Sequence, residues 1–126
     1  RLSGTVTGQA TAVATAGVAD AAPVALYQTY AVPVFGIGGK LTYDIPVAEG
    51  AYEILLHTRS GSEGVGTERF DLAINGVTVA SGVDRRAIAG AANRAVVLRY
   101  DVTVAPGQGL LIDLTNVTNN QGSLLA

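Results

Sequence analysis

Apolar and polar residues alternate with a period of two along most of the chain after residue 22. Leu41, Tyr43 and Ile45 are separated by single polar residues. The same alternation recurs at residues 52–56, 70–74, 96–104 and 110–114. Because successive side chains of a strand point to opposite faces, this pattern is typical of antiparallel strands with one buried face. We expect about seven or eight strands in an all-β, antiparallel β-sandwich of the jelly-roll type.

Turn sequences separate the expected strands. The dipeptide Asn75-Gly76 favours a two-residue hairpin, and we expect it to join strands at 70–74 and 77–80. Stretches rich in glycine or alanine predict longer connections. These stretches are residues 34–39, 60–67 and 83–94. No segment shows a helical period, so the sequence predicts no helix.

The first 22 residues differ in composition, and we treat them as an extended N-terminal arm before a sandwich formed by residues 23–126. Small residues with a tendency to extended structure alternate along this arm at Thr5, Val6, Thr7, Thr11, Val13 and Thr15. Small side chains bury little apolar area, at about 25 cal/mol per Å². Because terminal segments are ordered mainly when something holds them, we expect the arm to dock on its own domain or on a neighbouring molecule.

The composition excludes several kinds of site. The 126 residues include no cysteine and one histidine, which excludes disulfides, thiolate nucleophiles, cysteine-ligated zinc and multi-histidine metal sites. We therefore predict neither a metal nor a cofactor. A net charge of −2 argues against nucleic-acid binding. No apolar run reaches the roughly 18–20 residues of a membrane helix, so membrane insertion is not expected.

Four motifs occur in a distinctive order. They are Tyr-Gln-Thr at 27–29, Tyr-Asp-Ile-Pro at 43–46, Gly-Ala-Tyr at 50–52 and Phe-Asp-Leu-Ala-Ile-Asn-Gly at 70–76. Their order and spacing resemble the malectin and malectin-like domains. The resemblance covers roughly residues 26–120 and implies a β-sandwich that is extracytoplasmic, non-catalytic and often carbohydrate-binding. The absence of methionine, including at the first position, likewise suggests a secreted or cell-surface chain after processing, or an excised fragment.

The chain departs from this family at the positions that hold the ligand. A pair of aromatics that stacks on the sugar in malectin is replaced here by Thr-Arg-Ser-Gly at 58–61. No tyrosine precedes Tyr27, and Asn119 stands where the family has an aspartate. The last family strand is missing or cut short at residues 122–126. A missing strand would leave a neighbouring backbone edge open for another strand.

Candidate ligand-binding residues remain outside the regular strands. If the ligand is a sugar, the candidates are Tyr30, Phe35, Asp84, Arg85 and Asn119, because aromatic rings stack on sugars and polar side chains bind their hydroxyls. The alternation places Tyr43, Tyr52, Phe70 and Tyr100 towards the core. His57 is expected to cap or line the sandwich, so we predict no catalytic residue.

Two functions are consistent with these features. The first is a non-catalytic structural subunit that assembles with itself, as a surface filament or layer, by donating its N-terminal arm as a strand. The second is a carbohydrate-binding module of a larger secreted protein. The missing sugar-stacking aromatics and the alternating arm favour the first.

Overall fold

The computed structural model describes residues 2–3, 5–8, 13–32 and 36–118. Nine strands and two short helices lie within these ranges. In chain order they are β1 (Leu2–Ser3), β2 (Thr5–Gly8), α1 (Val24–Tyr27), β3 (Thr29–Val32), β4 (Lys40–Ile45), β5 (Gly50–Arg59), β6 (Arg69–Ile74), β7 (Val77–Asp84), α2 (Arg85–Ala89), β8 (Ala95–Val104) and β9 (Leu110–Asn116).

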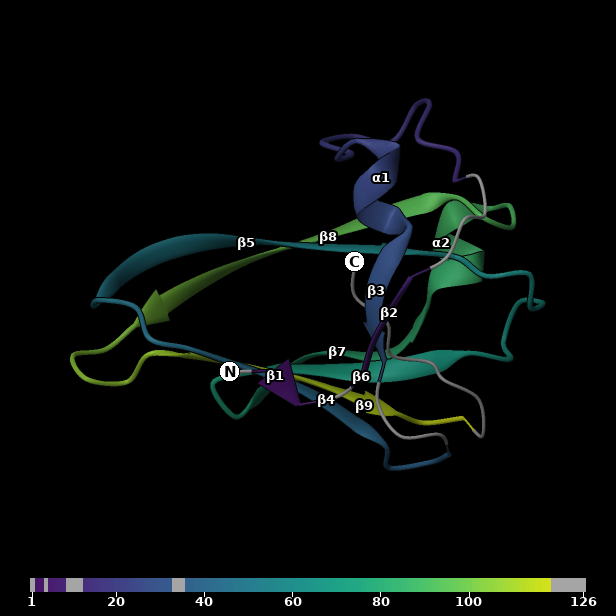
Figure 1. The fold of residues 1–126 in the computed structure, drawn as a ribbon. Coiled ribbons are helices and arrows are strands. Elements are labelled where there is room, and N and C mark those ends of the chain that lie inside the picture. Colours follow the sequence, from purple (N-terminus) through teal and green to yellow (C-terminus); the bar gives the residue numbers. More distant parts are fainter. Residues whose placement is uncertain (1, 4, 9–12, 33–35, 119–126) are drawn as a thin grey trace.

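The strands form two facing layers, shown in Figure 1. One layer is a five-stranded sheet in the order β1-β4-β9-β6-β7, and the other is the long ribbon of β5 and β8. A separate pair, β2 and β3, adds the buried Ala31 to the core. All these strand pairs are antiparallel. The predicted antiparallel two-sheet arrangement is confirmed.

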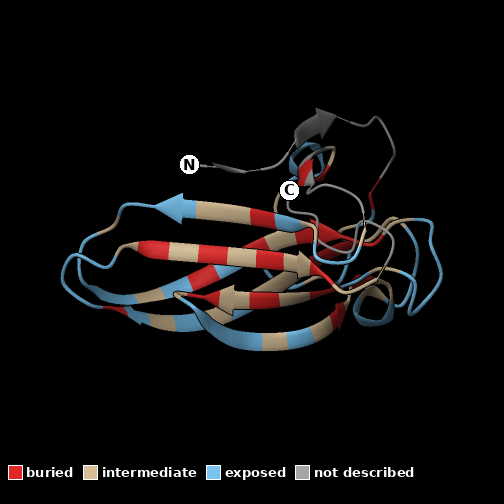
Figure 2. Cartoon of the chain, turned by 90° about the horizontal axis from the view of Figure 1, so that it is seen from below, coloured by how far each residue is buried: buried red, intermediate tan, exposed pale blue. Residues whose placement is uncertain are grey.

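The core lies between the layers and follows the alternation of the sequence. Every second residue of β9 is buried from Leu110 to Asn116, and β6 buries Phe70, Leu72 and Ile74. Figure 2 shows the resulting bands of buried and less buried residues along the strands. Hydrophobic burial of this kind is the main force that holds two sheets together.

The predicted hairpin between β6 and β7 is confirmed, with Asn75 and Gly76 at positive φ angles of 50° and 78°. These angles suit the tight turn that matches the twist of a β-ribbon. Asn75 also binds the neighbouring strand: its Oδ1 accepts from the backbone N–H of Leu111 at 2.8 Å, and its Nδ2 donates to the carbonyl of Gly109 at 3.3 Å. The turn therefore fixes the start of β9 as well as its own hairpin.

The two helices correct the sequence-based prediction. No helix was predicted, but α1 ends at Tyr27 of the Tyr-Gln-Thr motif, and the strand begins at Thr29. The expected loop at 83–94 instead contains α2, whose N-cap is Asp84: its side chain accepts from the backbone N–H of Ala87 at 3.1 Å. Both helices span a single turn or little more, which is too short to produce a recognisable helical period. None of the helices in the described parts of the chain is long and apolar enough to cross a membrane.

The described parts of the N-terminal arm dock on the same chain. β1 pairs with β4, and β2 pairs with β3. Ala14 donates its N–H to the carbonyl of Asn93 at 2.8 Å and accepts from the N–H of Ala95 at 2.9 Å. Val13 is buried against Tyr27 and Ala95. Of the other arm residues singled out in the sequence, Thr11 lies outside the described residues, and the division of the chain at residue 22 stays a prediction.

The first testable prediction concerns Asn75. Asn75→Gly keeps the freedom to adopt positive φ but removes the side-chain bonds to β9. We expect the free energy of unfolding to fall by about 1–2 kcal/mol, because each hydrogen bond contributes roughly 0.5–1.5 kcal/mol net. Urea denaturation measures this, with Thr78→Ala on the exposed face of the same hairpin as the control. Equal losses in both variants would contradict the role given to Asn75.

A second prediction concerns the arm. Ala14→Pro removes the N–H that binds Asn93 and should open the arm without unfolding the sandwich. A loss of about 1 kcal/mol raises the opened fraction about fivefold. Limited proteolysis should therefore cleave before residue 22 several times faster, while Ala14→Ser, which keeps the N–H, should match the parent chain. An unchanged cleavage rate in Ala14→Pro would show that other contacts hold the arm.

Candidate functional site

A cleft of about 340 Å³ opens on one side of the sandwich, between β5 and the strands β4 and β9. It is mainly apolar. The cleft is lined by Tyr43, Ile45, Tyr52, Glu53, Ile54, Leu55, Leu56, His57, Leu110 and Ile112.

The cleft exists because the layer formed by β5 and β8 is narrow. Among the described residues β5 pairs only with β8, so two strands face a sheet of five. Six consecutive residues of β5, 52–57, line the cleft. Since successive side chains point to opposite faces, a run of consecutive residues means that the strand edge forms this wall.

Tyr52 stands near the start of β5 in a fixed orientation. Gly50 beside it has a φ of 147°, a backbone conformation that favours glycine. The Tyr52 hydroxyl donates to the carbonyl of Ala48 at 2.8 Å. The sequence placed Tyr52 towards the core, but the side chain is only half-buried and borders the cleft.

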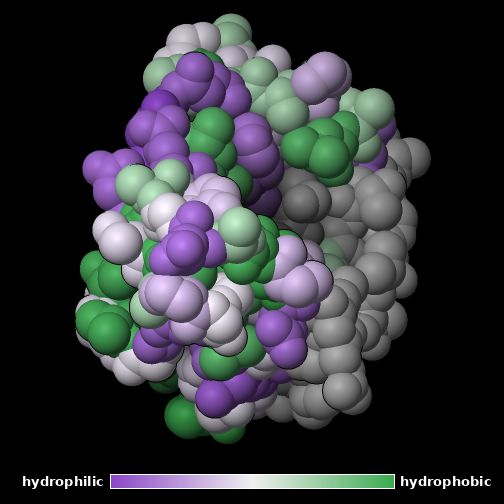
Figure 3. Space-filling view, turned by 90° about the vertical axis from the view of Figure 1, so that its left-hand side faces the viewer, coloured by the Kyte–Doolittle hydropathy of each residue, from purple (hydrophilic) through white to green (hydrophobic). Residues whose placement is uncertain are grey.

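A second hollow, of about 300 Å³, adjoins the cleft and shares Tyr52 and Glu53 with it. Its remaining lining residues are Ala51, Asp101, Val102 and Thr103. Glu53 lies opposite Asp101 in the register of β5 and β8, and Nη1 of Arg99 lies 3.7 Å from Glu53. Figure 3 looks onto this end of the molecule, where hydrophobic and hydrophilic residues lie side by side. We call this second hollow, lined by Tyr52, Glu53 and their neighbours, the polar hollow.

Two further groups border the cleft. Burial raises the pKa of Tyr43 above its ordinary value, so its hydroxyl remains a hydrogen-bond donor at neutral pH. Nδ1 of His57 lies 3.0 Å from the hydroxyl of the fully buried Tyr27, which also accepts from the N–H of Ala22. His57 thus links β5 to α1, consistent with the expectation that it lines the sandwich.

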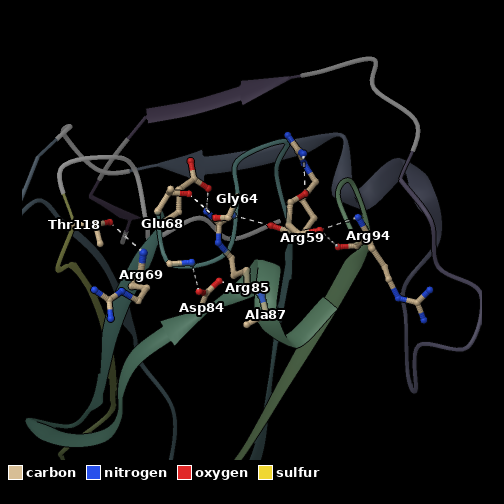
Figure 4. A network of polar contacts seen from close by, with 12 residues as sticks. Arg59, Gly64, Glu68, Arg69, Asp84, Arg85, Ala87, Arg94 and Thr118 are labelled. Atoms are coloured by element: carbon tan, nitrogen blue, oxygen red, sulfur yellow. Dashed lines mark hydrogen bonds and ion pairs between the residues drawn. The ribbon is translucent and has the colours of Figure 1, made fainter. Parts of the chain in front are cut away.

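The opposite end of the sandwich is closed by the polar network shown in Figure 4. Arg85 is only 2% exposed, forms an ion pair with Glu68 at 2.8 Å and donates to the carbonyl of Arg59 at 2.7 Å. Asp84 caps α2 and also accepts from the N–H of Gly66 at 2.6 Å. Burial raises the pKa of Glu68, and the Arg85 guanidinium opposes the shift only in part. These groups fasten the loop between β5 and β6 to α2.

Of the sequence-predicted ligand residues, the two whose side chains the structure describes, Asp84 and Arg85, do not line the cleft. Asp84 and Arg85 lie in the network at the other end, with their side chains engaged in it. Tyr30 lies on β3, opposite Thr7. Phe35 and Asn119 lie outside the described residues. As ligand-binding residues, all five stay predictions.

Sequence reasoning missed the residues of the polar hollow. Tyr52 was assigned to the core by its phase, and Glu53 and Asp101 were not among the candidate ligand residues. Their cross-strand pairing could have been inferred from the alternation of β5 and β8, but the narrowness of this layer could not. The part of the chain that the structure describes contains no group of three or more acidic or histidine side chains that could hold a metal ion.

Solved structures with the same fold include plant receptor ectodomains. No protein-family model matches the sequence, and a search of curated proteins finds no match. A chain in the crystal structure of the plant peptide RALF23 in complex with FER and LLG2 matches 97% of this chain with a TM-score of 0.81 and 20% identity. The ANX2 ectodomain from Arabidopsis thaliana matches 97% with a TM-score of 0.74 and 15% identity.

A Bacteroides uniformis β-glucuronidase also contains the fold, with 98% of this chain covered, a TM-score of 0.69 and 20% identity. The chain spans 37–38% of the two plant chains and 13% of the glucuronidase. At such identities the likeness establishes the fold alone. The receptor matches lie in malectin-like domains, and the chain therefore has the malectin-like fold that its sequence motifs predict.

Proposed function

We propose that this domain is a non-catalytic carbohydrate-binding module of a larger extracytoplasmic protein. The observation that carries the proposal is the position of Tyr52, a half-buried ring held by Ala48 and shared by the apolar cleft and the polar hollow. A ring fixed next to polar groups offers a surface on which the apolar face of a sugar stacks.

The polar hollow supplies the matching hydrogen-bond groups. Carboxylates of Glu53 and Asp101 accept from sugar hydroxyls, and the hydroxyl of Thr103 both donates and accepts. The lining of this hollow, as far as the chain is described, contains no lysine or arginine. Glu53 and Asp101 lie opposite each other, and the Arg99 guanidinium, 3.7 Å from Glu53, balances only one of the two carboxylates, so the ligand we propose is a neutral glycan and not a polyuronide.

The comparisons support a module within a larger protein. Chains with this fold include receptor ectodomains and a glycosidase, and in each of them the matched part is a minority of the chain. A non-catalytic role is supported by the only histidine, whose Nδ1 faces the hydroxyl of Tyr27 in the cleft wall. Location at the cell surface or outside the cell forms part of this proposal.

Self-assembly by donation of the N-terminal arm stays a prediction. The described strands of the arm pair within the chain, β1 with β4 and β2 with β3. An arm donated to a neighbour would first have to leave these partners. This cost makes assembly the weaker of the two functions considered.

The sugar-binding proposal predicts a loss on Tyr52→Ala. Stacking on an aromatic ring contributes about 0.5–1.5 kcal/mol, so affinity for a neutral oligosaccharide should fall between about twofold and tenfold. Titration calorimetry with cellotetraose, maltotetraose and galactotetraose measures it, with polygalacturonate as the charged comparison that should not bind.

Two variants serve as controls. Tyr52→Phe keeps the ring and loses only the bond to Ala48, so it should retain most of the affinity. Glu63→Gln, in the exposed loop at the far end, should have no effect. The proposal fails if no neutral oligosaccharide binds at millimolar concentration, or if Tyr52→Ala binds as tightly as the parent chain.

A further inference from the structure

The edge of β5 that faces the cleft carries unused strand-pairing capacity. Within the described residues this edge has no strand partner along residues 52–57, while the other edge pairs with β8 throughout. Every second residue of a strand directs its N–H and C=O to the same edge. Six residues extend about 20 Å at roughly 3.3 Å per residue. An open edge of this length is a template for an added strand.

The opposite wall of the cleft is apolar. Tyr43 and Ile45 come from β4, and Leu110 and Ile112 come from β9. Ile45 is 37% exposed, which is high for a residue that alternates with the core of the sandwich. A backbone edge beside apolar side chains matches what an extended peptide presents: hydrogen-bonding groups along one side and a side chain at every second position.

We infer that the cleft is a docking groove for an extended peptide strand of a partner protein. The strand pairs with β5 over residues 52–57 and directs alternate apolar side chains towards Ile45 and Leu110. A glycan uses the polar hollow instead, because an apolar wall and a row of backbone groups offer little to a sugar ring. The inference therefore goes beyond the proposed function and does not depend on it.

The charge around the groove specifies the partner further. Between Lys40 and Arg59 the sequence contains no lysine or arginine but three carboxylates, Asp44, Glu49 and Glu53. Glu53 is the only acidic residue in the groove lining, in which the structure shows no lysine or arginine. The nearby Arg99, whose Nη1 lies 3.7 Å from Glu53, also forms an ion pair with Asp20, and Asp101 lies opposite Glu53, so the carboxylates outnumber this arginine. A strand with lysine or arginine among its polar positions complements this charge. The arm strand of a second copy, Thr5–Gly8, carries no charge and is paired with β3.

The test uses the full chain and a capped heptapeptide, acetyl-Lys-Val-Thr-Val-Thr-Val-Lys-amide. We expect saturable binding in titration calorimetry, and protection from hydrogen exchange at alternate amides of residues 52–57. Ile45→Lys, which places a cation on the groove wall, should weaken binding at least tenfold. Val77→Lys, at a residue that is 64% exposed and lies outside the groove, is the matched control and should bind normally.

Two altered peptides separate the interactions. N-methylation of alternate residues blocks the backbone pairing and should abolish binding, and replacement of both lysines by glutamate should weaken it severalfold. Equal binding of the N-methylated peptide overturns strand addition. Equal binding of the glutamate peptide overturns the assignment of a basic partner.

Other occupants give distinct results. Concentration-dependent dimers that the heptapeptide dissociates would assign the groove to a second copy and overturn a partner protein. Tighter peptide binding by the full chain with Leu124→Asp and Leu125→Asp would assign it to the chain's own C-terminal segment, with the same consequence. Ile45→Lys should lose peptide binding and keep oligosaccharide binding. In the parent chain, absence of peptide binding with sugar binding intact overturns only the peptide inference, and absence of sugar binding with peptide binding intact overturns only the proposed function.

Discussion

Every backbone N–H and C=O of a sheet needs a partner, and in this domain that requirement is met unevenly. In the five-stranded layer the central strands are hydrogen-bonded along both edges, as β9 is to β4 and β6. The facing layer has two described strands, so each has one paired edge. The apolar cleft, the exposure of Ile45 and the half-burial of Tyr52 all follow from this difference in width. The cleft lies where the layer of β5 and β8 leaves part of the five-stranded sheet uncovered.

The two ends of the molecule serve different purposes as a result. At one end, Arg85, Glu68 and Asp84 join a loop, a helix and a strand through charge-assisted hydrogen bonds. Arg85 is 2% exposed, so removal of Glu68 would leave a buried charge without its ion-pair partner and destabilise this end. At the other end, Tyr52 and Glu53 lie on the border of open space. A closed end that holds the frame and an open end with two hollows suit the proposed recognition role.

Much of the fold could be predicted from the sequence, because period-two alternation is a local signal. It located β4, β6, β8 and β9, and Asn75-Gly76 located the hairpin. The short helices were missed because one turn has no period. The site was missed for another reason: whether Tyr52 is core or surface depends on how many strands cover it, and no local pattern contains that number. Likewise, the sequence places Arg85 in a loop, and its burial and ion pair with Glu68 become apparent only in the folded structure.

The position of β9 also has a consequence for how the chain folds. This strand is the last of the described elements, yet it occupies the middle of the larger sheet, with β4 on one side and β6 on the other. During synthesis the edges of β4 and β6 that pair with β9 therefore stay unpaired until residues 110–116 have emerged. Contacts between distant parts of a chain also form slowly. Asn75 holds the start of β9 and so helps to select its register when it arrives. The sheet closes late, and a ribosome-bound chain that stops before residue 110 lacks β9 and with it the core residues Leu110, Ile112 and Leu114.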